Sequence, residues 1–194
     1  HMRMGERLGK NIFSQMMLAI KEKMLMLVTS AQAAKLLRQL NDELRALQLK
    51  EANSSSFVAA IQEDIESVRP VYNFKKMRDA QAEVECKIRK VKHAINVFNT
   101  TTIIPDFNIT IDEMLVYLPQ LKAECTTLSK MRDAMPKVRV SSGYSGGGNI
   151  IDYKYANYDI EEVSKYYAEF SDTLAKAQTV LDLVNSTVEF EINI

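Results

Sequence analysis

The chain has 194 residues, of which 46% are hydrophobic and 26% are charged, as in ordinary globular proteins. Its 25 basic and 25 acidic residues leave no net charge, which excludes a general electrostatic attraction to nucleic acid or to anionic membranes. The cysteines, Cys86 and Cys125, are too few and too far apart for a disulfide framework or a zinc site. No apolar run reaches the roughly 18 residues of a membrane span, and we expect a cytoplasmic protein.

Two apolar seams at helical spacing run through the N-terminal part of the chain. The first covers residues 13–27 and the second covers residues 33–47, and the phase slips between them at Thr29-Ser30. We therefore expect residues 1–56 to form one long helix or a pair of helices.

Residues 57–194 are expected to form a helical hairpin core with a small sheet, in one continuous domain with the N-terminal part. A short helix is predicted over about residues 57–67, because Arg69-Pro70 ends it. Further apolar seams predict longer helices over 84–98, 111–135 and 160–184.

Two helix starts carry the sequence of a capping box, a short side-chain acceptor followed three residues later by Glu. They are Thr110 with Glu113, and Asp159 with Glu162. Pro119 follows the first of these starts, and we expect it to kink its helix or to mark a short first segment.

Between the helices the apolar period changes from helical spacing to two, which is the period of a strand. Three short strands are predicted over 137–140, 151–155 and 188–194, with a glycine-rich loop at 141–149 between the first two. The predicted fold class is mainly α: long antiparallel helical hairpins or a bundle, with a small antiparallel β element at the helix ends.

A short formula occurs twice, as INVFNTTTII at 95–104 and as LDLVNSTVEF at 181–190. In both copies an apolar helical run reaches an asparagine, Asn99 or Asn185, and continues into β-branched residues. Asparagine tolerates the left-handed conformation that ends helices, and β-branched residues favour strands. We interpret the formula as a signal that ends a helix and begins a strand.

The tyrosines are the candidate contact residues for a protein partner, because six of the eight lie within residues 144–167. An exposed aromatic cluster is typical of an interface, but the same rings could instead cover the end of the bundle. The candidates on this segment are Tyr144, Tyr153, Tyr155 and Tyr158. A methionine-rich segment near the N-terminus adds Met16, Met17 and Met24, which could contact a membrane or an adaptable partner surface. Core packing or an oligomer seam is the favoured interpretation of this segment.

Nucleic-acid contact is a weaker hypothesis, based on the basic stretch at Lys87, Arg89, Lys90 and Lys92. In a neutral protein such a stretch is more often the solvated side of a helix.

The loop GYSGGGN lacks the Gly-Lys-Ser/Thr of a phosphate-binding loop. No catalytic residue, metal ligand or cofactor is predicted, since His93 is the only histidine beyond the first residue.

From about residue 23 onward the order of motifs is similar to the septicolysin-like family of small bacterial helical proteins. The similar parts are AQAAKLLRQLNDELRALQLKEA, KIRKVKHAINVFNTTT, TIDEML, IIDYKYANYDIEE, and Asp182 and Asn185 before a terminal strand. The resemblance implies a helical protein and carries over no catalytic residue. The chain departs from the family pattern at Tyr117-Leu118-Pro119, where an Arg-Asp pair is expected, and in its extra N-terminal stretch.

The sequence therefore predicts a non-enzymatic bacterial interaction or scaffold protein that self-assembles as a homo-oligomer and contacts a protein partner. Free strand edges and narrow apolar seams both favour assembly. The alternative, suggested by the haemolysin behind the family name, is a membrane-active protein that uses its methionine-rich N-terminal helix.

Overall fold

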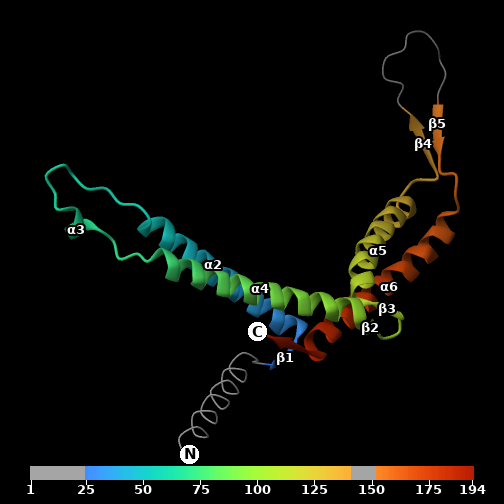
Figure 1. Ribbon diagram of the computed structural model, residues 1–194. Helices are drawn as coiled ribbons and strands as arrows, with labels where there is room; N and C mark the ends of the chain where they lie inside the picture. Colours follow the sequence, from blue (N-terminus) through green and yellow to red (C-terminus); the bar gives the residue numbers. More distant parts are fainter. Residues whose placement is uncertain (1–24, 141–151) are drawn as a thin grey trace, which may run out of the picture. The chain divides into compact units, whose positions relative to one another are not determined.

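The computed structural model describes residues 25–140 and 152–194, and 67% of these residues are helical. The predicted fold class, mainly α with small antiparallel β elements, is confirmed (Figure 1). The helices are α2 (Ser30–Ser54), α3 (Ile65–Val68), α4 (Phe74–Thr101), α5 (Ile111–Arg132) and α6 (Ile160–Thr187). The strands are β1 (Leu25–Thr29), β2 (Ile103–Ile104), β3 (Ile109–Thr110), β4 (Lys137–Val140), β5 (Asp152–Tyr155) and β6 (Glu189–Asn193).

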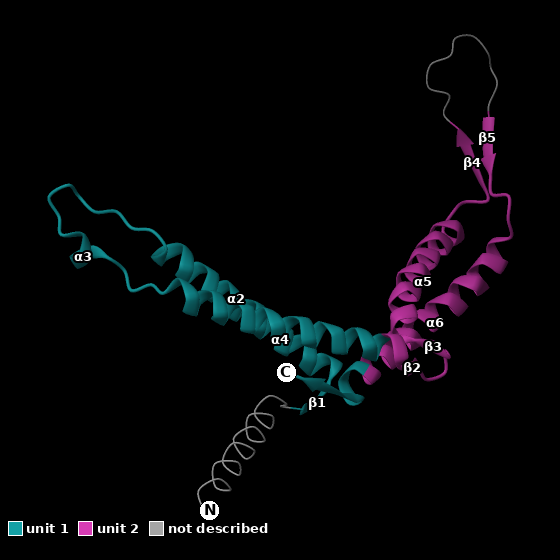
Figure 2. Ribbon diagram, in the orientation of Figure 1, with its two compact units in different colours: residues 1–99, 185–194 teal, residues 100–184 magenta. Residues whose placement is uncertain are grey.

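The chain divides into two compact units, coloured separately in Figure 2. Unit 1 comprises His1–Asn99 together with Asn185–Ile194, and unit 2 comprises Thr100–Val184. Residue 56, the end of the expected N-terminal part, lies inside unit 1, where α2 packs on α4.

Unit 1 is a long antiparallel hairpin of α2 and α4 with the β1–β6 sheet beside it (Figure 1). Apolar residues of the predicted seams over 33–47 and 84–98 form one core with the two strands, as expected when a helix buries a single stripe. The core residues are Val28, Ala33, Leu40, Val84, Ile88, Val91 and Ile192.

The first seam predicted a helix that includes residues 25–27, and this prediction is wrong. Leu25–Thr29 form strand β1, and helix α2 begins directly after it. Thr29 is the N-cap of α2, and its hydroxyl accepts a hydrogen bond from the backbone N–H of Gln32. The Gln32 side chain in turn accepts one from the Thr29 N–H, at 3.0 Å. This capping box coincides with the phase slip at Thr29-Ser30, which therefore marks a strand-to-helix junction.

Unit 2 combines α5 and α6 with two small hairpins, β2–β3 and β4–β5. The predicted capping box at Thr110 and Glu113 is confirmed, and α5 continues as one helix through Pro119. Asp159 accepts hydrogen bonds from the backbone of Glu161 and Glu162 at the start of α6. The buried residues of the two helices follow the predicted seams; they are Ile111, Met114, Leu121, Leu128, Val163, Ala177, Leu181 and Val184.

The two units repeat one pattern of strand pairing. In unit 1 the N-cap Thr29 pairs with Glu189, four positions after Asn185. In unit 2 the N-cap Thr110 pairs with Ile103, four positions after Asn99. Each copy of the repeated formula also lies at a boundary between the units. The formula therefore ends a helix, begins a strand and marks where the chain passes from one unit to the other.

The conformational explanation for those asparagines is wrong, although the position of the helix ends is right. Helices α4 and α6 each end two residues after the asparagine, at Thr101 and Thr187. Among the described residues other than glycine, positive φ occurs at Asp106 (66°) and Asn108 (54°). The left-handed residues thus belong to the β2–β3 turn, where they reverse the chain.

Two further expectations need correction. The predicted helix over 57–67 is reduced to the single turn of α3, and residues 56–64 are not helical. The three predicted strands are present as β4, β5 and β6, but they do not form one sheet: β4 pairs with β5, and β6 pairs with β1. No helix in residues 25–140 or 152–194 has the length and apolar character needed to cross a bilayer.

Candidate interaction surface

The β4–β5 hairpin has two sides, and both are exposed to solvent. The register pairs Lys137 with Tyr155 and Arg139 with Tyr153, and directly paired residues of an antiparallel sheet lie on the same side. We call this side the tyrosine face. The opposite side, the valine face, carries the alternate residues Val138, Val140, Asp152 and Lys154.

The tyrosine face is an ordered group of two rings and a cation. The Lys137 ammonium lies 4.0 Å from the ring centroid of Tyr153 and 5.4 Å from that of Tyr155. The two rings are themselves 6.4 Å apart between centroids. An exposed cation–π contact stabilises the arrangement of its two side chains by about 0.5–1 kcal/mol. Lys137 therefore helps to hold the two rings in place, while Tyr155 remains 61% exposed to solvent.

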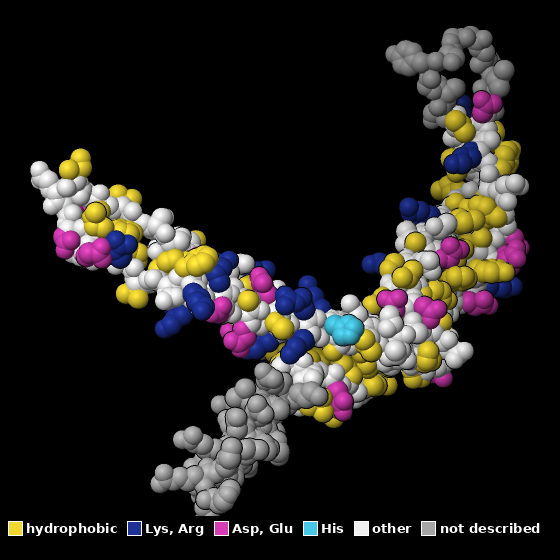
Figure 3. Space-filling model, in the orientation of Figure 1, with side chains coloured by type: hydrophobic (Ala, Val, Ile, Leu, Met, Phe, Trp, Pro, Cys, Tyr) yellow, Lys and Arg dark blue, Asp and Glu magenta, His cyan; other side chains and the backbone are white. Residues whose placement is uncertain are grey.

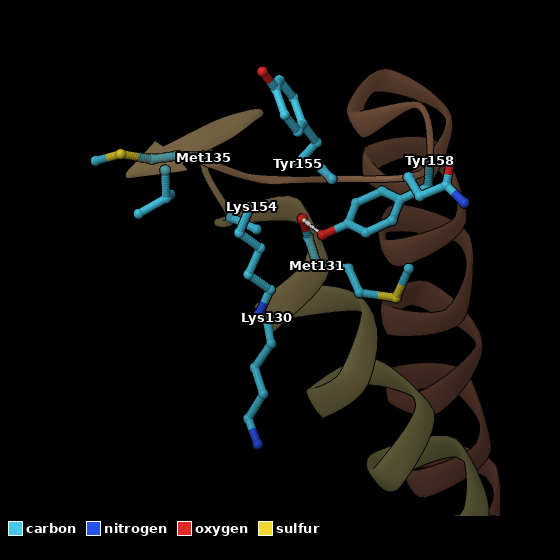
Figure 4. A pocket seen from close by; sticks show the side chains of 10 residues that line it. Lys130, Met131, Met135, Lys154, Tyr155 and Tyr158 are labelled. Carbon is cyan, nitrogen blue, oxygen red and sulfur yellow. Dashed lines mark hydrogen bonds between the residues drawn. The ribbon is translucent and has the colours of Figure 1, made fainter. Parts of the chain in front are cut away.

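Two other tyrosines of the cluster hold the ends of the helices of unit 2 together. The Tyr158 hydroxyl donates a hydrogen bond of 2.9 Å to the carbonyl oxygen of Met131, near the end of α5 (Figure 4). The Arg132 guanidinium lies 4.2 Å from the ring centroid of Tyr167 on α6. The cluster is therefore divided: Tyr158 and Tyr167 join elements of the unit, and Tyr153 and Tyr155 face solvent.

A cavity of about 510 Å³ lies beside the valine face, and we call it the lysine pocket. Its apolar lining includes Met131, Met135 and Val138. Lys130 and Lys154 add two cations to the lining, and none of the described residues that line the pocket is acidic. Neither lysine has an ion-pair partner among the described residues. In Figure 4 their side chains extend to the same side of the hairpin. The pocket thus suits an acidic occupant with apolar side chains.

The loop between α2 and α4 is a second exposed apolar region, which the candidate residues did not include. Val58, Ile61 and Val71 are almost fully exposed, at 93%, 106% and 99%. Figure 3 shows hydrophobic side chains beside Asp and Glu side chains at the end of the α2–α4 hairpin that carries this loop. The sequence analysis predicted a short helix here from the Arg69-Pro70 boundary. That boundary gave no indication that these apolar side chains would be exposed among the described residues.

A polar cluster joins α2 to α4 next to this loop. Glu51 accepts hydrogen bonds from the Gln81 amide at 3.0 Å and from the Tyr72 hydroxyl at 2.9 Å. It also pairs with the Arg78 guanidinium. The Gln81 and Tyr72 hydrogen bonds, helped by Arg78, lower the pKa of Glu51. Burial, followed by the contact with Glu51, raises the pKa of Tyr72. We interpret this cluster as a link between the two helices, since all its strong contacts are internal.

The candidates for nucleic-acid contact lie along α4. Lys87 forms an ion pair of 2.8 Å with Glu83, and the hydrogen bond in this pair raises the pKa of Lys87. Arg89, Lys90 and Lys92 are exposed. Ile88 and Val91, which alternate with them, are buried. The basic residues therefore form the solvent-exposed side of an ordinary amphipathic helix.

The remaining candidates are not brought together by the part of the chain that the structure describes. Tyr144, Met16, Met17 and Met24 lie outside the described residues. Within residues 25–140 and 152–194 there is no group of three or more His, Cys, Asp or Glu side chains that could hold a metal ion. The thiols of Cys86 and Cys125 are free and half-buried.

Comparison with known proteins adds one distant structural match. No protein-family model and no curated protein matches the chain. The crystal structure of a functionally unknown conserved protein from Corynebacterium diphtheriae is similar over 85% of this chain and 99% of that chain, with 16% identity and a TM-score of 0.48. Similarity at this level carries no information about function.

Proposed function

We propose that the protein is a non-enzymatic interaction protein that self-assembles, and that the β4–β5 hairpin with its lysine pocket is a contact surface. The observation that carries the proposal is the exposure of this hairpin's apolar and aromatic side chains. Tyr155 is 61% exposed and Val140 is 46% exposed, and Met135, which lines the pocket just before β4, is 70% exposed. Contiguous exposed apolar surface of this kind marks interaction sites.

The backbone of the hairpin supports the same proposal. β4 and β5 form a sheet of two strands, so each strand has one edge whose N–H and C=O groups have no partner in that sheet. Such edges readily pair with another chain. Lys137, Arg139 and Lys154 outnumber Asp152 on the two strands, so the approach of a second identical hairpin would bring an excess of like charge together. An acidic partner segment is therefore favoured.

The other predictions are subordinate to this proposal. Membrane activity through Met16, Met17 and Met24 stays a prediction, and dye release from anionic liposomes tests it. Nucleic-acid contact through Lys87 and its neighbours also stays a prediction, as does the resemblance to the septicolysin-like family. Bound nucleic acid would give the purified protein a high ratio of 260 nm to 280 nm absorbance, and this ratio would fall when the protein is purified at higher salt concentration.

The proposal is tested by the mass of the protein in solution. Size-exclusion chromatography with light scattering should show a homo-oligomer for the wild-type chain. Tyr155→Ala should shift it toward the monomer, because the most exposed ring of the contact surface is removed. Tyr166→Ala is the matched control, since Tyr166 is a 50% exposed tyrosine on α6 outside the hairpin. A wild-type chain that is monomeric at every concentration contradicts the proposal.

A further inference from the structure

Residues 57–68, which we call the tip segment, have a helical pattern without a helix. Val58, Ile61 and Ile65 follow steps of three and four, which places them on one side of a helix. In the structure only Ile65–Val68 are helical, while Val58 and Ile61 are almost completely exposed. A short helix is marginal alone and needs a surface that covers its apolar stripe. The tip segment therefore lacks its packing partner within the described residues.

The tip segment is acidic as well as apolar. It contains Glu63, Asp64 and Glu66 and no basic residue. Arg69, just after it, neutralises Glu66 through hydrogen bonds of 2.8 and 2.9 Å. Glu63 and Asp64 remain without an ion-pair partner among the described residues. A partner surface for the tip segment needs an apolar floor with basic groups beside it.

The lysine pocket of unit 2 has this complementary composition. Its floor is formed by methionine, alanine and valine side chains, and its charged groups are Lys130 and Lys154. Its volume of about 510 Å³ lies in the range of roughly 300–1,000 Å³ typical of binding pockets. Methionine-rich linings adapt well to aliphatic side chains, so that Val58 and Ile61 are suitable occupants.

We propose that the tip segment of one copy docks, as an amphipathic helix, in the lysine pocket of a second copy. The proposal rests on the self-assembly proposed above and identifies its contact. Pairing two lysine pockets or two tip segments would bring like charges together, whereas a pocket with a tip segment brings opposite charges together. Such a contact is heterologous, so it generates a ring if it closes and a filament if it does not.

The sequence around the tip segment is compatible with a longer helix. Ser56 stands immediately before it, and serine is a favoured N-cap. Ala59 and Ala60 have the highest helix propensity of any residue type. Helix α3 now begins at Ile65 with Asp64 as its N-cap, and the Asp64 carboxylate accepts a hydrogen bond from the Glu66 N–H. Extension of the helix on the partner would replace this cap, so the docked form needs the burial of Val58 and Ile61 to offset the loss.

The test uses the full-length chain and two variants of exposed side chains, measured by light scattering. Ile61→Asp alters the tip segment, and the double variant Lys130→Glu with Lys154→Glu alters the pocket. Each should weaken assembly by about tenfold or more, since a charge is placed in an apolar site or the attraction is reversed. The matched controls are Val71→Asp, on the same loop, and Lys122→Glu, on α5; both should assemble like the wild-type chain.

Mixing the two variants distinguishes contact between copies from contact within one chain. The Ile61→Asp copy retains its pocket, and the Lys130→Glu/Lys154→Glu copy retains its tip segment. Their mixture should form a one-to-one dimer that does not grow further. Hydrogen exchange should show residues 58–64 protected in the wild-type assembly and unprotected in the pocket variant, because helix formation shields these amides.

The outcomes separate this inference from the proposed function. If the wild-type chain assembles and the Ile61→Asp chain assembles equally well, the docking of the tip segment is refuted while self-assembly stands. A mixture of the two variants that stays monomeric also refutes it. If the wild-type chain is monomeric, both proposals fail. Circular dichroism of every variant confirms folding, which is expected because the changed side chains are on the surface.

Discussion

The ring of Phe98 stacks on the ring of Phe190, with the centroids 4.4 Å apart and the ring planes inclined by 16°. Phe98 is on α4 and is 5% exposed, and Phe190 is on β6, close to the C-terminus. The stack therefore holds the last strand of the chain against the helical hairpin of unit 1. Aromatic pairs of this geometry stabilise by about 0.5–1.5 kcal/mol beyond the area that they bury.

Replacing Phe98 should strongly destabilise unit 1. Phe98→Ala removes a buried ring and its stacking contact, and we expect the free energy of unfolding to fall by roughly 3–5 kcal/mol. Urea denaturation followed by circular dichroism measures this. Phe74→Ala, at a 66% exposed position on the same helix, should change it by less than about 0.5 kcal/mol. Equal effects of the two changes would contradict the role given to the stack.

The two threonine caps should make similar contributions, because they occupy equivalent positions in the two units. Thr29→Ala and Thr110→Ala each remove a side-chain acceptor at a helix N-terminus. Each should lower the free energy of unfolding by about 1 kcal/mol. Thr173→Ala on α6, where the hydroxyl donates to the Glu169 carbonyl within the helix, serves as the control and should have little effect. The equivalence fails if only one cap matters.

The Glu51 cluster should make stability depend on pH in the acid range. The pKa of Glu51 is lower in the folded chain than in the unfolded chain. Its contribution to stability is therefore complete above its unfolded pKa and is lost as the pH falls through its lowered folded pKa. Glu51→Gln should be less stable than the wild-type chain at pH 7, and the difference should shrink below about pH 4.

Urea midpoints measured across pH for both chains test this expectation. Glu85→Gln, an exposed carboxylate on α4, controls for the loss of one negative charge. A difference between the wild-type chain and Glu51→Gln that stays constant from neutral to acidic pH would show that the cluster does not depend on the ionised carboxylate.

The Tyr158 hydroxyl should stabilise the end of α5. Tyr158→Phe removes its 2.9 Å hydrogen bond to the Met131 carbonyl and should reduce the free energy of unfolding by about 1 kcal/mol. Tyr166→Phe changes a half-exposed ring in the same way and should be neutral. Thermal unfolding of the two variants compares them directly, and identical midpoints would leave the hydroxyl without a structural role.

Local patterns in the sequence determined most of the secondary structure. The apolar spacing of residues 84–98 and 160–184 identified α4 and α6, since a helix must bury one stripe. The Thr110–Glu113 pattern located the start of α5, because a cap is an interaction between near neighbours. Period-two alternation located β4, β5 and β6 for the same local reason. The tyrosine cluster was also visible, although its division into structural and exposed rings was not.

Only the tertiary structure decided which elements meet. Leu25–Thr29 have a spacing that suits a helix, but pairing with β6, more than 150 residues later in the chain, makes them a strand. Propensity and periodicity are weak preferences that long-range hydrogen bonds and packing override. The tip segment shows the opposite case: its helical pattern has no packing surface among the described residues, so one turn forms and Val58 and Ile61 stay exposed to solvent. The local sequence limits which secondary structures a segment can form. The packing surfaces and strand partners that the fold provides determine which of them it adopts.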